Sequence, residues 1–443
     1  MNEHASSQSM RKVAMTSLAG TSIEWYDFFL YGTAAALVFP RAFFPGDMDP
    51  WVALMAAFGT FAVGFIARPL GGVVFGHFGD KFGRKKALVT ALMMMGGATT
   101  LIGLLPTYVA IGAAAPVLLT ILRFVQGLAI GGQWGGAMLL VTENAPSNQR
   151  GFYGAFAQAG APCGLILANL AFLAVSWSVS DEAFMEWGWR IPFLLSVVLI
   201  GLSAYVQLHI EDTAAFKELE EGAHHDVDEA VEAAKPKPTS RSPILEAIRL
   251  HPREIVLGAG AFLSVQVSFY ILVAWIVAYG SNAEGLGLSR DVMLLAVLVA
   301  SLVQIPVLFM ASAWSDRHGR KGVYILGAVL LGIWSFALFP LVDTGNVLLV
   351  IVGITVGQVF VGFMYGPQAA FLAELFATHV RYSGASLGYQ LGAIVGGALA
   401  PTIATYLWSE WGIIFVSVYM AIASVLTIIS VMLLTETSGR ELT

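Results

Sequence analysis

The sequence predicts an all-α polytopic membrane protein in which twelve transmembrane helices form two pseudo-symmetric six-helix bundles. Three observations lead to this fold class: the chain is strongly apolar, its long apolar segments number twelve, and charged motifs of the first half recur in the second. Of the 443 residues, 57% are hydrophobic and only 12% are charged. About a quarter of the residues of soluble proteins are charged, so the composition excludes a soluble globular domain.

Each predicted helix is an apolar segment of about 20 residues, the length that crosses a bilayer. Six segments precede a polar interval and six follow it. The chain therefore divides into an N-terminal bundle at 1–208, a charged cytoplasmic linker at 209–253 and a C-terminal bundle at 254–443. The segments lie at 17–38, 52–76, 87–105, 115–142, 152–177, 191–208, 255–279, 291–313, 323–341, 347–372, 383–408 and 412–434.

The distribution of basic residues predicts that both chain termini are cytoplasmic. Eighteen Lys and Arg fall on the side of the termini, three on the opposite side and two inside the segments. Cytoplasmic loops carry the excess of basic residues, which gives the orientation. The first apolar segment is too long for a signal-peptide core and has no clear cleavage site, so we expect it to be retained. Tryptophans, which prefer the membrane interface, mark the outer ends of the segments at Trp51, Trp177, Trp187, Trp189, Trp408 and Trp411.

Charged motifs at the inner ends of the segments repeat between the two halves. The pattern Asp80, Gly83, Arg84 recurs 236 positions later, and the pair Glu143, Arg150 recurs 231 positions later. Two offsets this close indicate two copies of one six-helix unit. The simpler interpretation gives the basic residues a topological role alone. We favour latches of an inner gate, made of Asp80, Arg84, Glu143, Arg150, Asp316, Arg320, Glu374 and Arg381.

Two carboxylates, Glu24 and Asp27, lie deep in the first apolar segment, where an ionised group is costly. They are three residues apart and share one face of a helix, and all eight histidines fall in tails, loops or segment ends. Counting residues along each segment places Asp27 at the level of Arg123 and Glu24 near the level of Arg68. We predict the pairs Asp27–Arg123 and Glu24–Arg68, either as proton-coupling groups or as static ion pairs that fix helix register.

Several motifs resemble those of known transporters. Residues 80–85 (DKFGRK) and 123–127 (RFVQG) resemble signatures of the major facilitator superfamily. Residues 24–28 (EWYDF), 65–72 (FIARPLGG), 131–136 (GGQWGG) and 187–193 (WGWRIPF) are similar to motifs of its metabolite:H+ symporter family, which includes bacterial carriers of shikimate, α-ketoglutarate, citrate and proline or betaine. One departure is Gln133, where many relatives carry an acidic residue.

The resemblance implies the fold of that superfamily, a location in the inner membrane of a bacterium, and a helix 1 acid paired with a helix 4 arginine. Protonated Asp27 would then leave Arg123 free for a substrate carboxylate, and proton release inside would let Asp27 reclaim Arg123. Central polar side chains are candidates to line the path, or else make ordinary interhelical hydrogen bonds. They are Tyr31, Gln126, Gln133, Trp134, Gln158, Gln266, Tyr270, Gln304, Tyr365, Tyr389 and Gln390.

Other function classes find no support in the sequence. It contains no nucleotide-binding loop, zinc-protease motif or nucleophile elbow, so we expect neither direct ATP drive nor an enzyme. The single cysteine, Cys163, excludes disulfides, and we expect no metal, cofactor or nucleic-acid partner and a monomer. We predict H+-coupled uptake of a small organic carboxylate: aromatic or alicyclic monocarboxylates first, dicarboxylates second and zwitterionic osmolytes third. A proton-coupled exporter is the main alternative.

Overall fold

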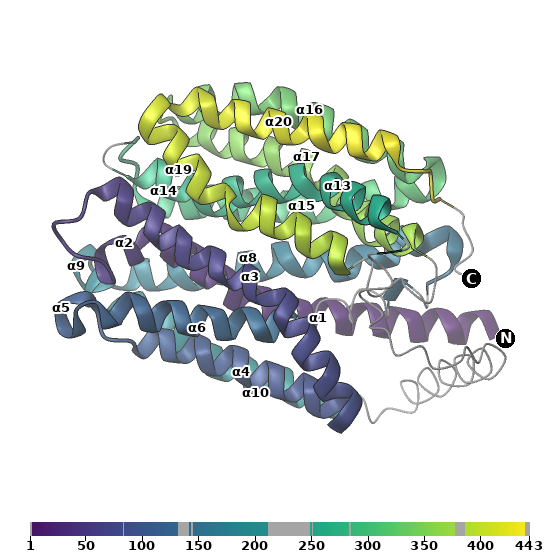
Figure 1. Cartoon of the computed structure of the whole chain (residues 1–443), viewed down its shortest axis with the longest axis horizontal. Helices are drawn as coiled ribbons and strands as arrows, with labels where there is room; N and C mark the ends of the chain where they lie inside the picture. Colours follow the sequence, from purple (N-terminus) through teal and green to yellow (C-terminus); the bar gives the residue numbers. More distant parts are fainter. Residues whose placement is uncertain are drawn as a thin grey trace.

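Long helices run side by side along one axis of the molecule (Figure 1). In the computed structural model the described backbone comprises residues 2–82, 84–131, 141–142, 145–210, 249, 251–282, 285–376 and 386–438. Side chains are described for these residues outside 2–9, 12, 76–77, 79–88, 147, 199 and 202–210. The predicted linker at 209–253 therefore lies almost entirely outside the described residues.

The described residues of the N-terminal half, up to residue 210, form six long helices and short connecting ones. The long helices are α1 (Asn2–Leu37), α3 (Pro50–Phe82), α4 (Arg84–Leu104), α6 (Ala114–Gly131), α8 (Arg150–Ser178) and α10 (Arg190–Ile210). Short elements at their ends are α2 (Phe39–Ala42), α5 (Tyr108–Ile111), η1 (Ser147–Gln149), α9 (Asp181–Ala183) and the π-helical η2 (Phe184–Gly188).

The C-terminal half, from residue 251, repeats this plan. One long helix is composed of α13 (Pro252–Tyr270), the π-helical η3 (Ile271–Trp275) and α14 (Ile276–Ser281). It is followed by α15 (Arg290–His318), α16 (Arg320–Val342), α17 (Val347–Leu375), a helix that includes η4 (Ala393–Ala398) and α19 (Ala400–Trp411), and finally α20 (Ile413–Leu433).

The predicted fold class is confirmed. Within the described ranges there is no strand, and every predicted segment falls on one of the long helices. Nine helices of this part of the chain are long and apolar enough to cross a membrane by length and composition, and α4 contributes a shorter apolar stretch, Val89–Leu104.

Two boundaries differ from the sequence prediction. The polar N-terminal tail is helical from Asn2, and α3 continues to Phe82 while α4 begins at Arg84, so helix replaces most of the expected loop. Likewise only Gly319 separates α15 from α16. Gly319 has a φ of +97°, which side-chain-bearing residues rarely adopt, so the repeated glycine allows this sharp turn.

The two halves form two layers that meet along α8 (Figure 1). Here α8 packs against α15 and α17, α3 against η4 and α19, and α1 against η3 and α14. Both ends of the described chain lie at the same end of the helices (Figure 1). We call this the terminal end of the molecule, and the other the distal end.

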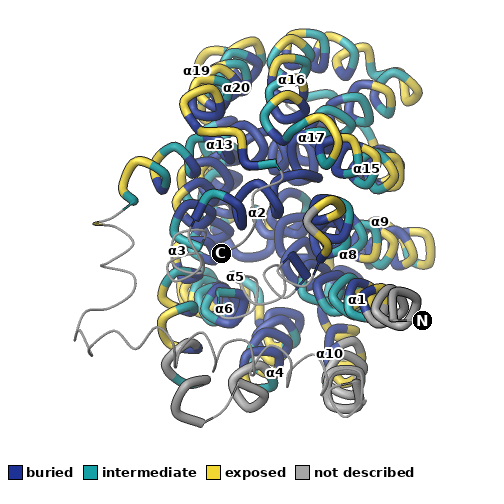
Figure 2. The backbone as a smooth tube through the Cα atoms, turned by 90° about the vertical axis from the view of Figure 1, so that its right-hand side faces the viewer, coloured by how far each residue is buried: buried dark blue, intermediate teal, exposed yellow. Residues whose placement is uncertain are grey.

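Apolar side chains cover the outer surface of the helices. Figure 2 shows buried residues where helices face one another and exposed residues around the periphery. Large aliphatic side chains are exposed on α10, α16 and α20, for example Val198, Ile333 and Met432. A soluble monomer rarely exposes so extensive an apolar surface, whereas a bilayer covers it without cost.

Candidate functional site

Close contact between α3 and α6 positions two buried arginines. A Cβ atom added at Gly71 would lie 1.9 Å from the Leu128 carbonyl oxygen, and one added at Gly131 would lie 1.9 Å from the Arg68 carbonyl oxygen. Only glycine permits backbones to approach this closely. A Cβ at Gly64 would lie 2.5 Å from Nε of Arg123, so Gly64 also leaves the space that this side chain occupies.

Arg123 on α6 is fully buried among aromatic rings. Its guanidinium carbon lies 4.3 Å from the ring centroids of both Phe28 and Tyr31. Nη1 donates a hydrogen bond to Oε1 of Gln126 at 3.0 Å, and Nε donates to the Phe61 carbonyl oxygen at 3.4 Å. Nη2 is buried without a hydrogen-bond partner. Cation–π contacts therefore take the place of a carboxylate partner in stabilising this charge.

Asp27 on α1 faces α10. Its side chain accepts a hydrogen bond from the Ser196 hydroxyl at 2.5 Å, while Oδ2 is buried without a partner. The neighbouring Tyr26 hydroxyl donates to the Pro192 carbonyl oxygen at 2.8 Å, which fixes α10 against this part of α1. Asp27 is 1% exposed, so its carboxyl group is held in an apolar site by neutral hydrogen-bond donors.

Arg68 on α3 lies one step further toward the terminal end. It is 2% exposed, and its guanidinium carbon lies 4.3 Å from the Phe65 ring centroid and 4.5 Å from that of Phe28. Hydroxyls of Tyr270 and Tyr389, both from the C-terminal half, are its hydrogen-bonding neighbours. Nε and Nη2 have no partner. A buried guanidinium with open donors is an unfilled site for an anion.

The two predicted ion pairs are not formed in this conformation. Ion pairs among the described side chains include neither Asp27 with Arg123 nor Glu24 with Arg68. The depth argument set the level of each group along the helix axis but left its direction around that axis open. Asp27 points at α10, and aromatic rings of α1 and α3 enclose both arginines.

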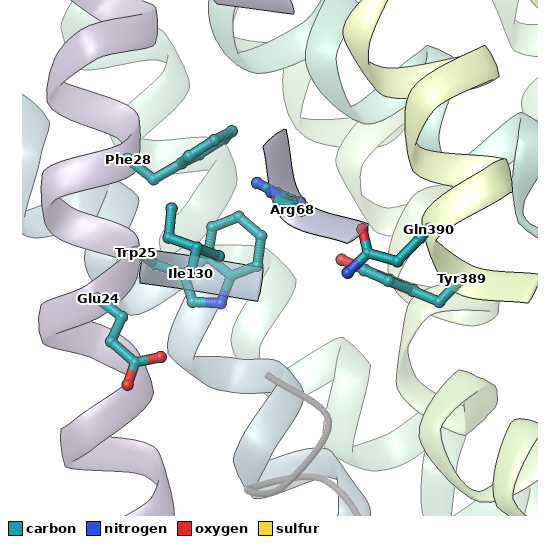
Figure 3. A pocket seen from close by; sticks show the side chains of 7 residues that line it. All are labelled: Glu24, Trp25, Phe28, Arg68, Ile130, Tyr389 and Gln390. Atoms are coloured by element: carbon teal, nitrogen blue, oxygen red, sulfur yellow. The ribbon is translucent and has the colours of Figure 1, made fainter. Parts of the chain in front are cut away.

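A small cavity lies between the two halves at Arg68. It has a volume of about 10 Å³, which is roughly the space needed for one water molecule. Figure 3 shows the polar ends of Tyr389 and Gln390 pointing toward Arg68 from the opposite half. The wall is completed by one aliphatic, two aromatic and one acidic side chain: Ile130, Trp25, Phe28 and Glu24.

Contacts between the described residues of the two halves occur at both ends of the molecule. At the distal end, Arg290 on α15 lies 2.7 Å from Asp181 and donates to the Ser176 hydroxyl on α8 at 2.9 Å. The rings of Trp51 and Trp408 meet there at a centroid distance of 4.2 Å. The cavity at Arg68 therefore lies between two sets of contacts that join the halves, one toward each end of the molecule.

At the terminal end, four of the predicted gate residues form one network across the halves. Arg320 lies 2.6 Å from Asp316 and 3.0 Å from Glu374, and Arg150 of α8 lies 3.3 Å from Glu374. Asp316 also accepts the backbone N–H groups at the start of α8, at 2.8 and 2.9 Å. Of the other gate residues, Glu143 and Arg381 lie outside the described residues, as do the side chains of Asp80 and Arg84.

A family comparison decides what class of protein this architecture belongs to. The model of the family described as "Sugar (and other) transporter" matches residues 12–443. The chain belongs to this transporter family. It is therefore a membrane-spanning transporter of the major facilitator superfamily and not an enzyme.

Relatives within the transporter family carry different cargo. The inner membrane metabolite transport protein YhjE of Escherichia coli K12 is 41% identical, over 99% of this chain and 97% of its own. The shikimate transporter of the same organism is 40% identical, over 90% and 89%. The proline/betaine transporter of Salmonella typhimurium LT2 is 32% identical, over 98% and 85%. These names span a carboxylate and a zwitterion, so the family alone leaves the substrate open.

Solved structures share the fold. The proton:xylose symporter XylE with a bound sugar derivative superposes with a TM-score of 0.74, over 98% of both chains and at 18% identity. The superposition covers both halves, in agreement with the twelve-helix architecture predicted from the sequence.

The remaining predicted substrate residues of this transporter fall into separate groups. Gln158 donates to the Tyr365 carbonyl oxygen at 3.2 Å across the interface, and Gln266 neighbours Tyr389. The Tyr31 hydroxyl donates to Thr60 at 2.7 Å, beneath Arg123. Gln304 is buried away from the cavity with both amide atoms unpartnered. Gln133 and Trp134 lie outside the described residues.

Sequence reasoning missed Ser196, Thr99 and Gly64, which surround Asp27 and Arg123. Serine, threonine and glycine are frequent in transmembrane helices, so no single one stands out in a sequence. Two further buried amides, Gln358 and Gln368 on α17, lack hydrogen-bond partners and were also not predicted. A glutamine in an apolar segment can be recognised in the sequence, so Gln358 and Gln368 could have been included among the candidate residues.

Proposed function

We propose that this transporter is a proton-coupled symporter that takes up a small organic carboxylate by alternating access. The observation that carries the proposal is Arg68, a buried guanidinium that lines the cavity between the halves and has open donors and no carboxylate partner. Placing a substrate carboxylate against these donors would form a charge-assisted, bidentate contact, the strongest type available to such a group.

Two like charges near one aromatic ring add to this argument. The ring of Phe28 has Arg68 at 4.5 Å and Arg123 at 4.3 Å. Two unpaired cations at this spacing repel each other in an apolar medium, so an entering anion stabilises the pair. The aromatic rings of Trp25 and Phe28 in the cavity wall favour a flat or cyclic substrate, which places aromatic and alicyclic monocarboxylates first.

The proton site in this proposal is Asp27. It lies in an apolar environment with neutral partners, so proton uptake removes the cost of a buried uncompensated charge. Compared with the sequence prediction, the structure favours Arg68 over Arg123 as the first contact of the substrate. Arg123 would respond to the proton on Asp27.

The cycle would then alternate between the two closures. Opening the distal end admits substrate and proton, and opening the terminal end requires the network of Arg150, Asp316, Arg320 and Glu374 to break. We place the terminal end in the cytoplasm, in the inner membrane of a bacterium, because basic residues are concentrated there. One chain would suffice, because both halves that form the cavity belong to it.

A zwitterionic osmolyte is the second candidate, and Glu24 is the observation that favours it. Glu24 and the indole of Trp25 line the same cavity as Arg68. An acid and an aromatic face together bind ammonium groups, so a substrate such as glycine betaine would place its carboxylate at Arg68 and its cation at Glu24.

Uptake by proteoliposomes tests the proposal. Vesicles with an imposed inward proton gradient are offered radiolabelled benzoate, shikimate, α-ketoglutarate, citrate, proline and glycine betaine in turn. We expect accumulation of one of the carboxylates, which a protonophore abolishes. Accumulation of betaine or proline alone favours the second candidate, while proton-driven emptying of preloaded vesicles indicates an exporter and overturns both.

Variants of the cavity sharpen the test. Arg68→Gln removes the charge and should abolish binding of carboxylates in a thermal-shift measurement, whereas Arg68→Lys keeps the charge and should retain weak binding. Glu24→Gln is the matched control: carboxylate uptake should tolerate it, and betaine uptake should not. Full binding by Arg68→Gln would remove the basis of the proposal.

A further inference from the structure

A row of hydrogen-bonding side chains runs from Arg123 to Thr99, which lies beside Asp27, although Arg123 and Asp27 form no ion pair. Nη1 of Arg123 donates to Oε1 of Gln126 at 3.0 Å, and Nε2 of Gln126 donates to Oγ1 of Thr99 at 2.7 Å. The Thr99 hydroxyl also lies beside the Asp27 carboxyl group, although its proton is donated to Met95 in this conformation. Thr99 and Gln126 are 0% and 1% exposed, so water does not compete for these bonds.

We propose that Thr99 on α4 and Gln126 on α6 are positioning residues that transmit the protonation state of Asp27 to Arg123, in place of a direct ion pair. This inference rests on the proposed function, in which Asp27 binds the transported proton. It assigns Gln126 a role in coupling, whereas the sequence placed it among the substrate contacts.

The direction of each hydrogen bond explains how the row would switch. A hydroxyl has one proton, and that of Thr99 is donated to the Met95 carbonyl oxygen at 2.9 Å. Its oxygen accepts from Gln126, whose amide is held at both ends. When Asp27 ionises, its open Oδ2 becomes the strongest acceptor nearby, and the Thr99 proton turns from Met95 to Asp27. No proton leaves Thr99 or Gln126 in this step.

Reorientation of Thr99 has a consequence for Arg123. A Thr99 hydroxyl that donates to a carboxylate is a stronger acceptor for Gln126, and the polarised Gln126 amide is in turn a stronger acceptor for Arg123. Arg123 and Arg68 lie against the same Phe28 ring. A change in the hydrogen bonding of Arg123 therefore acts on the Phe28 ring, which lines the cavity together with Arg68.

The charged and titratable groups around Asp27 leave few other routes. On its own helix they are Glu24, Tyr26 and Tyr31. From the packed helices they are Arg68 of α3, Arg123 of α6 and Tyr270 of α13, which all lie against the ring of the adjacent Phe28. Among the side chains that the structure describes, α4, α8 and α10 bring no charged group into ion-pair distance of Asp27. From α4 and α10 the neighbours are the hydroxyls of Thr99 and Ser196.

Variants are compared in proteoliposomes. The substrate is the compound from the uptake panel that the wild type accumulates most. Thr99→Val removes the hydroxyl and keeps the shape, and Thr99→Ser restores the hydroxyl. Proton-driven accumulation is measured against external pH, and substrate exchange is measured without a gradient. We expect Thr99→Val to reduce accumulation about tenfold and to flatten the pH profile of accumulation, while substrate exchange is retained. Thr99→Ser should restore the accumulation and its pH profile.

Gln126→Met keeps the length of the side chain but removes its hydrogen bonds to Arg123 and Thr99, so it should behave as Thr99→Val does. It serves as the test variant if Thr99→Val is unstable. Wild-type accumulation and pH profile in both variants would overturn the inference. So would an equal loss of exchange and accumulation, which marks a purely structural role. Asp27→Asn is measured in parallel. If this variant keeps proton-driven uptake, the proposed proton site itself is wrong. If Asp27→Asn loses proton-driven uptake while Thr99→Val keeps wild-type accumulation, only the role of Thr99 and Gln126 is refuted.

Discussion

Asp316 at the end of α15 binds the first turn of α8: its two carboxylate oxygens accept the backbone N–H groups of Gly151 and Phe152 at 2.8 and 2.9 Å. The contact joins the C-terminal half to the N-terminal half at the terminal end. A carboxylate at a helix N-terminus satisfies unpaired N–H groups and interacts favourably with the helix dipole. Because this contact uses two identified N–H groups, hydrogen exchange at these two amides reports whether the contact is formed.

Asp316→Asn should loosen that closure. Loss of the charged acceptor weakens both bonds, so hydrogen exchange at the amides of Gly151 and Phe152 should accelerate about tenfold. Mass spectrometry of peptides from residues 145–155 measures this rate. The Asn346→Ala variant is the control, because Asn346 accepts from Leu348 and Leu349 at the start of α17, far from this contact in the chain. Equal exchange in Asp316→Asn and the wild type would contradict the assignment.

Gly71→Ala should disrupt the crossing of α3 and α6. The added Cβ would lie 1.9 Å from the Leu128 carbonyl oxygen, so the helices must separate, at a cost of about 1–3 kcal/mol. We expect a lower thermal unfolding midpoint and weaker substrate binding, because Arg68 moves with α3. Gly59→Ala on the same helix is the matched control, since no atom lies within 4 Å of its added Cβ. A midpoint unchanged in Gly71→Ala would refute the close approach.

Two ion pairs between the halves should differ in their effect. Asp181 has a side chain that is 91% exposed, and surface pairs contribute only about 0–1 kcal/mol to the free energy of unfolding, so Asp181→Asn should shift the thermal midpoint little. Glu374 is buried and accepts from Arg150, Arg320 and Thr437, so Glu374→Gln should destabilise strongly and raise proteolysis at the terminal end. Similar midpoints for the two variants would show that burial does not govern these contacts.

Glu436, after the last helix, should make the docking of the C-terminal tail sensitive to acid. Burial raises the pKa of its carboxyl group, but hydrogen bonds from four backbone N–H groups lower this pKa by more, so it lies below the ordinary 4.5. The donors are Arg320, Ser438, Lys321 and Thr437. A depressed pKa means stabilisation that is complete above pH 4.5 and is lost as the pH falls through the folded pKa.

Limited proteolysis of the tail checks this pH dependence. In the wild type, cleavage after residue 434 should stay slow from pH 8 to about pH 5 and accelerate at lower pH. Glu436→Gln lacks the titrating group, so its cleavage rate should be higher at neutral pH and change little on acidification. A wild-type tail that is released already at pH 6 would exclude Glu436 as the cause.

The fold was predictable because the membrane leaves so few solutions. Apolar segments of bilayer length must be helices, and the recurrence of Asp80, Gly83 and Arg84 at Asp316, Gly319 and Arg320 indicates the internal repeat. The structure then joins Arg150 to three of the predicted gate residues, a grouping that charged positions at segment ends already indicated. Whether these contacts gate transport stays a prediction.

The candidate site was less accessible to sequence reasoning. Depth could be counted, but the direction in which Asp27 faces depends on how α1 is rotated against α10, and this rotation is set by the packing of many side chains. The aromatic surroundings of Arg123 were equally hidden, because phenylalanines are common throughout the chain. Pairing by charge alone therefore selected partners that this conformation keeps apart.

The contacts of α8 with α15 limit the motion that transport can use. Both helices have 29 residues, about 43 Å at 1.5 Å per residue, and they are fastened near each end: Asp316 holds the start of α8, and Ser176 near its end donates to Asp291 at 2.5 Å. A tilt of about 5° around one fastened end would displace the other end by about 3.7 Å, beyond hydrogen-bond reach. The two helices could thus tilt about one contact at a time, so that a rotation of a few degrees breaks one fastening while the other stays engaged.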